Sequence, residues 1–258
     1  MDKRTFLRSL GLLSLAAVPS VHGMERWIEL HDHIAPEELA GDEKFWQGIR
    51  KGYRLKPDYI NLENGYYCMQ PEKTLEGFIQ HVRDVNYQAS YYMRNVQRKN
   101  KKIMSDKLAK LVDCPADELI ITRNTTESLD MIIGGFHWEV GDEAVMAEQD
   151  YGAMLNMFKQ VARRNGVVNK IVSVPNHPES DEEIVKLYAD AITDKTKLLM
   201  VCHMINITGH ILPIRKICDM AHSKGVQVMV DGAHTVGHIK FSMKDLDCDY
   251  YGASLHKW

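Results

Sequence analysis

Two residues with chemically useful side chains, a lysine and an aspartate, each follow an apolar run in the second half of this sequence. Lys257 comes after residues 250–254, and Asp231 comes after residues 226–230. A lysine amine is a nucleophile toward carbonyl carbons, and a carboxylate at the mouth of a buried strand needs a partner. Taken singly, the lysine is more typical of a solvated surface, and the aspartate equally fits a helix cap or a metal ligand. Their meaning therefore depends on the other polar residues that follow apolar runs.

One such group is the segment Arg-Asn-Thr-Thr-Glu at 123–127, which follows the apolar residues 119–122 and opens a helical pattern. Threonine at a helix start can cap the helix, but free N–H groups beside hydroxyls also bind phosphate. Neither a G-x-G-x-x-G nor a Walker A motif is present, which disfavours a dinucleotide or a nucleoside triphosphate. Thr125 and Thr126 are therefore candidates for holding the phosphate of another ligand.

Two further candidates follow other apolar runs. Tyr151 comes after residues 144–147 and can stack on a flat ring, although a packed core tyrosine is the common alternative. Asn206 follows His203 and the run that ends at Cys202, where it can bond a phenolate oxygen or cap a turn. Pyridoxal phosphate (PLP) would use such groups, because it has a phosphate, a ring face, a phenolic oxygen and a ring nitrogen whose proton an aspartate can hold.

The elements that must position these residues alternate between short apolar strands and helices of 10–15 residues. This alternation is typical of an α/β fold, in which helices cover both faces of a mostly parallel sheet and ligands bind at the carboxyl ends of the strands. The pattern predicts strands at 119–122, 144–147, 170–174, 197–202, 226–230 and 250–254, and helices at 125–136, 152–164, 181–192 and 213–223. Upstream it predicts a helical segment at 24–58, a strand at 59–62 and a long helix from Pro71 to about residue 111.

Composition narrows the class of protein. The chain has 258 residues, 45% of them hydrophobic, and a net charge of −3, so it can bury a normal core and carries no basic stripe typical of a nucleic-acid-binding protein. Its five cysteines form no C-x-x-C pair, so we expect neither a disulfide framework nor a metal site.

The N-terminus resembles an export signal. A basic start, Lys-Arg-Thr-Phe-Leu at 3–7, precedes a weakly apolar run and is similar to a twin-arginine signal with lysine in the first basic position. The run is too short for a stable membrane span. We therefore expect residues 1–23 to direct export to the periplasm; the alternative is the N-terminal helix of a cytoplasmic protein.

Five features in this order resemble the class V aminotransferase family of fold-type I PLP enzymes, and most closely its isopenicillin N epimerase-like branch, with cysteine desulfurases as cousins. They are Asn-Thr-Thr-Glu at 124–127, Tyr151, Asn206 before Thr-Gly at 208–209, Asp-Gly-Ala-His at 231–234, and Ser-Leu-His-Lys at 254–257. The resemblance covers residues 58–258 and implies a PLP-binding large domain at 59–258. Many relatives have glutamine where His234 stands and histidine where Tyr151 stands, which favours the epimerase-like branch over a desulfurase.

The resemblance also implies a role for each residue. Lys257 would form a Schiff base with the cofactor and move protons, and Asp231 would pair with its ring nitrogen. The remaining cofactor contacts would come from Thr125, Thr126, Ser254 and His256 at the phosphate, Tyr151 at the ring face, and Asn206 and His234 at the phenolic oxygen. Asn64 and Gly65 match a segment that lines the substrate pocket in relatives.

The implied activity is transamination or epimerisation at the α-carbon of an amino acid or related amine. A cysteine desulfurase-like enzyme and a non-catalytic relative or inactive fragment are the alternatives. In this family the large domain continues after the lysine and a smaller C-terminal domain follows, so we expect a truncated chain that has little activity by itself. Relatives are homodimers, and the same is expected of the full-length protein.

Overall fold

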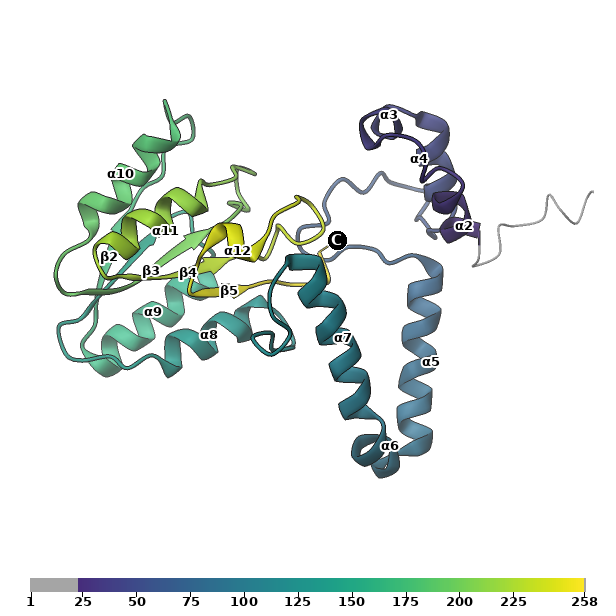
Figure 1. The fold of residues 1–258 in the computed structure, drawn as a ribbon, viewed down its shortest axis with the longest axis horizontal. Helices are drawn as coiled ribbons and strands as arrows, with labels where there is room; N and C mark the ends of the chain where they lie inside the picture. Colours follow the sequence, from purple (N-terminus) through teal and green to yellow (C-terminus); the bar gives the residue numbers. More distant parts are fainter. Residues whose placement is uncertain (1–22, 258) are drawn as a thin grey trace, which may run out of the picture. The chain divides into compact units, whose positions relative to one another are not determined.

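The computed structural model describes residues 23–257, which divide into two compact units (Figure 1). The first unit contains residues 23–62 and 69–94, and the second contains residues 63–68 and 95–257. The predicted export signal lies outside the described residues, except for Gly23. Within the described part of the chain, no helix is both long enough and apolar enough to cross a membrane.

The first unit is helical, as the sequence predicts for residues 24–58. Its helices are α2 (Gly23–Glu29), α3 (Pro36–Ala40), α4 (Glu43–Arg50) and α5 (Glu72–Gln88). Asp42 caps α4 by accepting a hydrogen bond of 2.8 Å from the Lys44 amide. Phe45 is the buried residue of α4, and its carbonyl oxygen accepts a 3.1 Å bond from the Trp27 indole. This hydrogen bond joins α2 to α4.

The second unit contains the predicted α/β pattern, and α6 (Ser90–Asn95) spans the boundary between the units. The helices of the second unit are α7 (Gln97–Val112), α8 (Thr125–Gly135), α9 (Gly152–Asn165), α10 (Asp181–Ala191), α11 (Ile214–Ser223) and α12 (Met243–Leu246). Its strands are β1 (Glu143–Ala147), β2 (Val168–Val172), β3 (Thr196–Cys202), β4 (Gln227–Asp231) and β5 (Tyr250–Gly252). Five of the six strands predicted between residues 119 and 254 are thus confirmed, with ends shifted by up to two residues.

These five strands form one parallel sheet in the order β2-β1-β3-β4-β5. The chain leaves β1 toward β2 in one direction and then continues through β3, β4 and β5 in the other. The order therefore reverses between β1 and β3, and open parallel sheets bind ligands outside the carboxyl ends of the strands at such a reversal.

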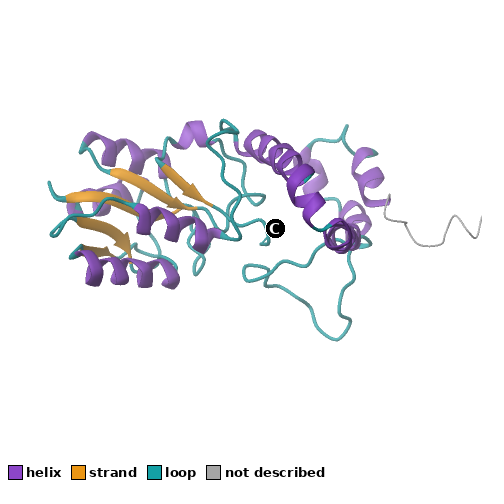
Figure 2. Cartoon of the chain, turned by 90° about the horizontal axis from the view of Figure 1, so that it is seen from below, coloured by secondary structure: helices purple, strands orange, loops and turns teal. Residues whose placement is uncertain are grey.

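The sheet is sandwiched between two helical layers (Figures 1 and 2). Side chains alternate across each strand, so Val145 and Ala147 pack with α10 and α11, whereas Ala144 and Met146 pack with α8 and α9. Because helices cover both faces, all five residues of β1 are buried. The rigid sheet places its strand ends at fixed positions relative to the start of α8.

Three predictions about secondary structure are wrong. Residues 59–62 and 119–122 belong to no strand, and Ile60, Leu62 and Ile120 are 84%, 90% and 76% exposed. An apolar segment becomes a strand only when a neighbouring strand supplies its hydrogen bonds, and the described sheet supplies none to these two. The long helix predicted from Pro71 is instead divided into α5, α6 and α7, with the first break at Ala89, where φ is 47°.

Candidate active site

A cavity of about 320 Å³ lies within the second unit and is lined by residues that follow four strands of the sheet. Its volume suits a small molecule. The lining residues are Glu63, Gly65, Tyr66, Asn124, Thr125, Thr126, Tyr151, Met154, Cys202, Met204, Asn206, Asp231, Ala233, His234, Ser254, His256 and Lys257. The cavity thus gathers every residue predicted for the site except Asn64, which is exposed and does not line it.

The topology explains why residues so far apart in sequence meet here. Tyr151 follows β1, Asn206 follows β3, His234 follows β4 and Lys257 follows β5. All four strands are parallel, so their carboxyl ends share one edge of the sheet. The cavity adjoins the reversal of strand order between β1 and β3, where the fold predicts a ligand.

Hydroxyl groups and a helix start form one corner of the cavity. Asn124 caps α8 by accepting a 2.9 Å bond from the Glu127 amide. The Thr125 amide donates to the Ser254 hydroxyl over 3.1 Å, and the two hydroxyl oxygens lie 2.6 Å apart. Both side chains are buried. This corner combines a positive helix end with hydroxyl donors, which is the chemistry that binds phosphate.

Lys257 extends its amine into the same cavity. The amine nitrogen lies 3.1 Å from His234 Nε2 and 5.9 Å from the centre of the Tyr151 ring. Burial lowers the pKa of Lys257, and the charge of Asp231 opposes that shift. Burial also lowers the pKa of His234, and the lysine charge acts in the same direction. A neutral imidazole can accept a hydrogen bond from the amine, so His234 orients Lys257.

Asp231 is almost fully buried at the end of β4, where one carboxylate oxygen accepts a 3.0 Å bond from the Ala233 amide. Burial raises the pKa of Asp231, whereas the Ala233 bond and the charge of Lys257 lower it. A buried carboxylate that faces a cavity is costly unless a cation or a donor meets it there. The site therefore favours a ligand that brings a protonated nitrogen to Asp231.

Two neighbouring groups that the sequence did not single out as site residues are Cys202, which lines the cavity, and Asp150, which does not. Asp150 is 5% exposed, accepts a 2.8 Å bond from the Ala147 amide and bonds the Cys202 thiol. Burial raises the pKa of Asp150 to about 7, and burial likewise raises the pKa of Cys202 well above its ordinary value. No motif marks this pair, because Asp150 follows β1 whereas Cys202 is the last residue of β3, and the two meet only in the folded sheet.

One side of the cavity is less enclosed. Asn206 is exposed, and Tyr151 is 42% exposed. A side chain at Gly65 would meet His234 Cε1 at 3.1 Å, so this glycine allows the segment at 63–66 to approach the histidine closely. Glu63 accepts a 2.9 Å bond from the Tyr66 amide, which shapes that segment into a turn. Gly65 thus lines the cavity, and its role in substrate binding stays a prediction.

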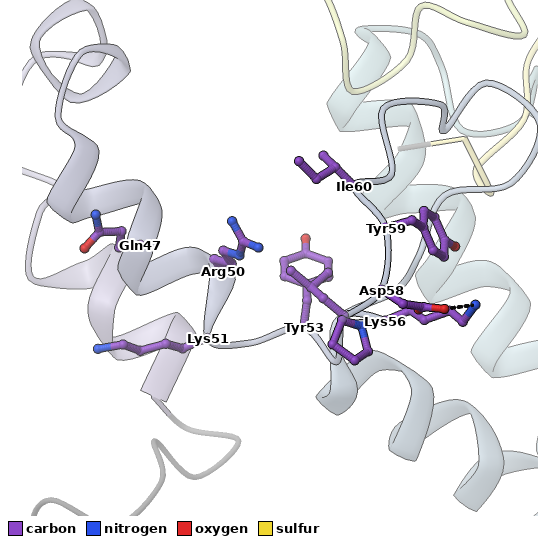
Figure 3. A pocket seen from close by; sticks show the side chains of 10 residues that line it. Gln47, Arg50, Lys51, Tyr53, Lys56, Asp58, Tyr59 and Ile60 are labelled. Carbon is purple, nitrogen blue, oxygen red and sulfur yellow. Dashed lines mark ion pairs between the residues drawn. The ribbon is translucent and has the colours of Figure 1, made fainter.

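A second cavity, of about 670 Å³, lies in the first unit and has a different character (Figure 3). Its polar side chains point mostly to solvent: Lys51 extends away from Tyr53, and Lys56 pairs with Asp58 over 2.9 Å with both side chains 63% exposed. Exposed ion pairs of this kind contribute little binding energy. Polar side chains converge instead in the cavity around Lys257, which is therefore the candidate site.

Comparisons with known proteins place this chain in one family. The family model "Aminotransferase class-V" matches residues 69–258, and the chain belongs to this family. It is 27% identical over 219 residues to the isopenicillin N epimerase of Streptomyces clavuligerus, covering 83% of this chain and 54% of that protein. It is 26% identical over 208 residues to the cysteine desulfurase of Haloferax volcanii, covering 77% of this chain and 48% of that protein.

Solved structures agree on the fold. A C-DES mutant with glycine covalently linked to its PLP cofactor matches with a TM-score of 0.72 at 21% identity, over 81% of this chain and 56% of that chain. The predicted fold-type I architecture and the epimerase-like class V resemblance are therefore confirmed. The chain spans about half the length of the curated relatives that it matches.

Proposed function

We propose that this chain is the PLP-binding part of an enzyme that acts on an amino acid or related amine by transamination or epimerisation at the α-carbon. The observation that carries the proposal is the convergence, in one cavity, of the Lys257 amine, the buried Asp231 carboxyl group and the hydroxyl groups at the start of α8. Membership of the class V family supports the same cofactor. When bound, PLP supplies a carbonyl carbon for attack and a ring that withdraws electrons from the substrate's α-carbon.

The residues present fit this cofactor. Its phosphate would lie at the start of α8, held by Thr125, Thr126, Ser254 and His256. Its protonated ring nitrogen would give the buried Asp231 carboxylate a cationic partner, which removes the cost of leaving that charge alone. Tyr151 would cover one face of the ring. Each role uses a group that already lines the cavity.

Lys257 has the properties required of the residue that attaches the cofactor and moves protons. Because burial lowers its pKa, more of its amine is neutral at a given pH than in an exposed lysine, and the neutral amine is the nucleophile. His234 Nε2, 3.1 Å away, can accept a proton or a hydrogen bond from it. Asn206 and His234 would also bond the phenolic oxygen, and Gly65 would leave room for substrate.

A cysteine desulfurase is the second candidate, because curated desulfurases are among the relatives. Desulfuration needs a thiolate that can reach the substrate's sulfur. Cys202 lines the cavity, but it is 4% exposed, it bonds Asp150, and burial raises its pKa far above the ordinary value. Cys202 is therefore suited to a structural role rather than to carrying sulfur. The similarity to isopenicillin N epimerases supports transamination or epimerisation as the first candidate.

The test is a visible absorbance spectrum of the purified protein with PLP, before and after borohydride reduction, followed by incubation with a panel of amino acids. We expect a band that reduction converts to a stable form and that Lys257→Ala abolishes. The control is Lys240→Ala, because Lys240 is exposed and does not line the cavity. A folded wild-type protein that binds no PLP would refute the proposal. Sulfide release from cysteine, with no keto acid and no inverted amino acid formed, would favour the desulfurase.

The partners and location of the full-length protein follow as separate proposals. A homodimer is proposed from the family resemblance, and light scattering of the purified protein tests it. Export to the periplasm is proposed from residues 1–23, and fractionation of cells that express the protein with and without this segment tests it.

A further inference from the structure

A chain of hydrogen bonds lies behind the cavity and connects the ends of β3, β4 and β5. His203 Nδ1 lies 3.0 Å from the Tyr251 hydroxyl oxygen, and this oxygen is also hydrogen-bonded to the Thr235 hydroxyl. The Thr235 hydroxyl in turn donates to the Gly232 carbonyl oxygen over 2.9 Å. Thr235 is fully buried, and His203 is 4% exposed. None of these three side chains lines the cavity.

The number of hydrogens determines the direction of every bond in this chain. A carbonyl oxygen only accepts, so the single Thr235 hydroxyl hydrogen goes to Gly232. Thr235 must then accept from Tyr251, which uses the only hydrogen of the tyrosine hydroxyl. The Tyr251 oxygen can therefore only accept from His203, which requires a hydrogen on Nδ1. Burial lowers the pKa of His203 to about 4, so near neutral pH the ring is uncharged and carries this one N–H hydrogen.

The same hydrogen-bond chain adjoins the turn at 231–235, which carries three residues that line the cavity: Asp231, Ala233 and His234. Asp231 and His234 belong to the turn at 231–235, and Thr235 ends it. The Tyr251 ring lies directly against Gly232, where any Cβ would overlap it. Backbone bonds join the same three strand ends, from the His203 amide to the Asp231 carbonyl oxygen over 2.9 Å and from the Gly232 amide to the Gly252 carbonyl oxygen over 2.8 Å. Among the three side chains of the hydrogen-bond chain, Tyr251 is thus the one that bonds both His203, after β3, and Thr235, in the turn.

We propose that Tyr251 is a positioning residue: its hydroxyl, oriented by the His203 Nδ1–H, holds the turn at 231–235 so that Asp231 and His234 face the cofactor and Lys257. This inference rests on the proposed function. It predicts that the hydroxyl, and not only the ring, matters for the cofactor site. The fixed tautomer of His203 is a consequence that exists with or without a bound cofactor.

Tyr251→Phe tests the hydroxyl, because it keeps the ring against Gly232 and removes one oxygen. Tyr250→Phe is the matched control: Tyr250 is the preceding residue of β5, and it packs against the opposite face of the sheet. Thr235→Val removes the hydroxyl that bonds Tyr251 and Gly232, and Thr235→Ser keeps that hydroxyl. The first measurement is the ¹⁵N NMR spectrum of the His203 ring in the cofactor-free protein. The second is the affinity for PLP and the pH at which the bound cofactor's absorbance changes.

We expect wild-type His203 to carry its hydrogen on Nδ1 and to lose this preference in Tyr251→Phe. Tyr251→Phe and Thr235→Val each remove a hydroxyl that makes two bonds of the chain, and each should weaken PLP binding roughly threefold to tenfold and shift the pH of the absorbance change. Tyr250→Phe and Thr235→Ser should do neither. Circular dichroism confirms that each variant is folded.

Two results would overturn the positioning role. One is a wild-type His203 with its hydrogen on Nε2. The other is a folded Tyr251→Phe variant whose PLP affinity and absorbance titration match those of the wild type. A wild-type protein that binds no PLP would refute the proposed function instead. The two failures are distinguishable, because the NMR measurement needs no cofactor.

Discussion

Asp150→Asn is expected to remove a pH-dependent part of the protein's stability. Asp150 is buried beneath the cavity, and burial raises its pKa from the ordinary 3.8 to about 7. At pH values between these two pKa values, Asp150 keeps its proton in the folded protein but has released it in the unfolded chain. Unfolding therefore releases a proton, and the free energy of unfolding falls as the pH rises through this window. Above about pH 7, the pKa of Asp150 in the folded protein, this contribution to the free energy of unfolding is fully lost and no longer changes with pH.

The size of the effect follows from the gap between the two pKa values. A gap of about 3 units corresponds to about 4 kcal/mol, at about 1.4 kcal/mol per unit. Asparagine has nearly the same shape, keeps an oxygen to accept the 2.8 Å bond from the Ala147 amide, and has no titratable proton. The variant should therefore lack this decline and should gain stability relative to the wild type as the pH rises.

The assay is urea unfolding followed by circular dichroism at several values between about pH 4 and about pH 7.5, for wild type and variant. The readout is the difference in slope, because any constant cost of the substitution cancels. Asp194→Asn, at an exposed position in the turn before β3, controls for the loss of a carboxylate. Parallel curves for wild type and Asp150→Asn would refute the reasoning, since they would show that the buried carboxyl group is already ionised at low pH.

Three further substitutions test the framework that positions the site. Asn124→Ala should lower the free energy of unfolding by about 1 kcal/mol, because α8 loses its capping oxygen, and an unchanged urea midpoint would contradict this. Gly232→Ala should cost about 1–3 kcal/mol, because its methyl group would overlap the Tyr251 ring; a melting temperature equal to that of the wild type would argue against such close packing. Phe158→Ala, at a fully buried position, should cost about 3–5 kcal/mol in the same urea assay, and a loss below 1 kcal/mol would contradict its place in the core.

The three central strands of the sheet, β1, β3 and β4, could be predicted because they are buried on both faces. The continuous apolar runs of β1, β3 and β4 are long enough to be recognised, and each is followed by a polar residue at the carboxyl end. Residues 119–122 carry the same signal, yet they form no strand, because pairing depends on a neighbour that local sequence does not reveal. Ile120 is 76% exposed, so for this segment the apolar pattern predicted neither burial nor strand pairing.

The site shows the same division between local and distant information. Lys257 and Asp231 could be predicted, since their types and positions after strands match the chemistry of the family. The contact of Thr125 with Ser254 joins residues 129 positions apart, and nothing local predicts a bond between those two hydroxyls. The Asp150–Cys202 pair could not be predicted for the same physical reason. Only the folded sheet shows that the Asp150 carboxyl group is buried and lies next to Cys202.

The most direct test of the central claim is to identify the residue that PLP modifies. The protein is loaded with PLP, reduced with borohydride, digested and analysed by peptide mass spectrometry. We predict that the reduced cofactor is found on Lys257 and is absent when the same procedure is applied to Lys257→Ala. Modification of another lysine in the wild type, at full cofactor occupancy, would contradict the assignment of the cavity around Lys257 as the active site.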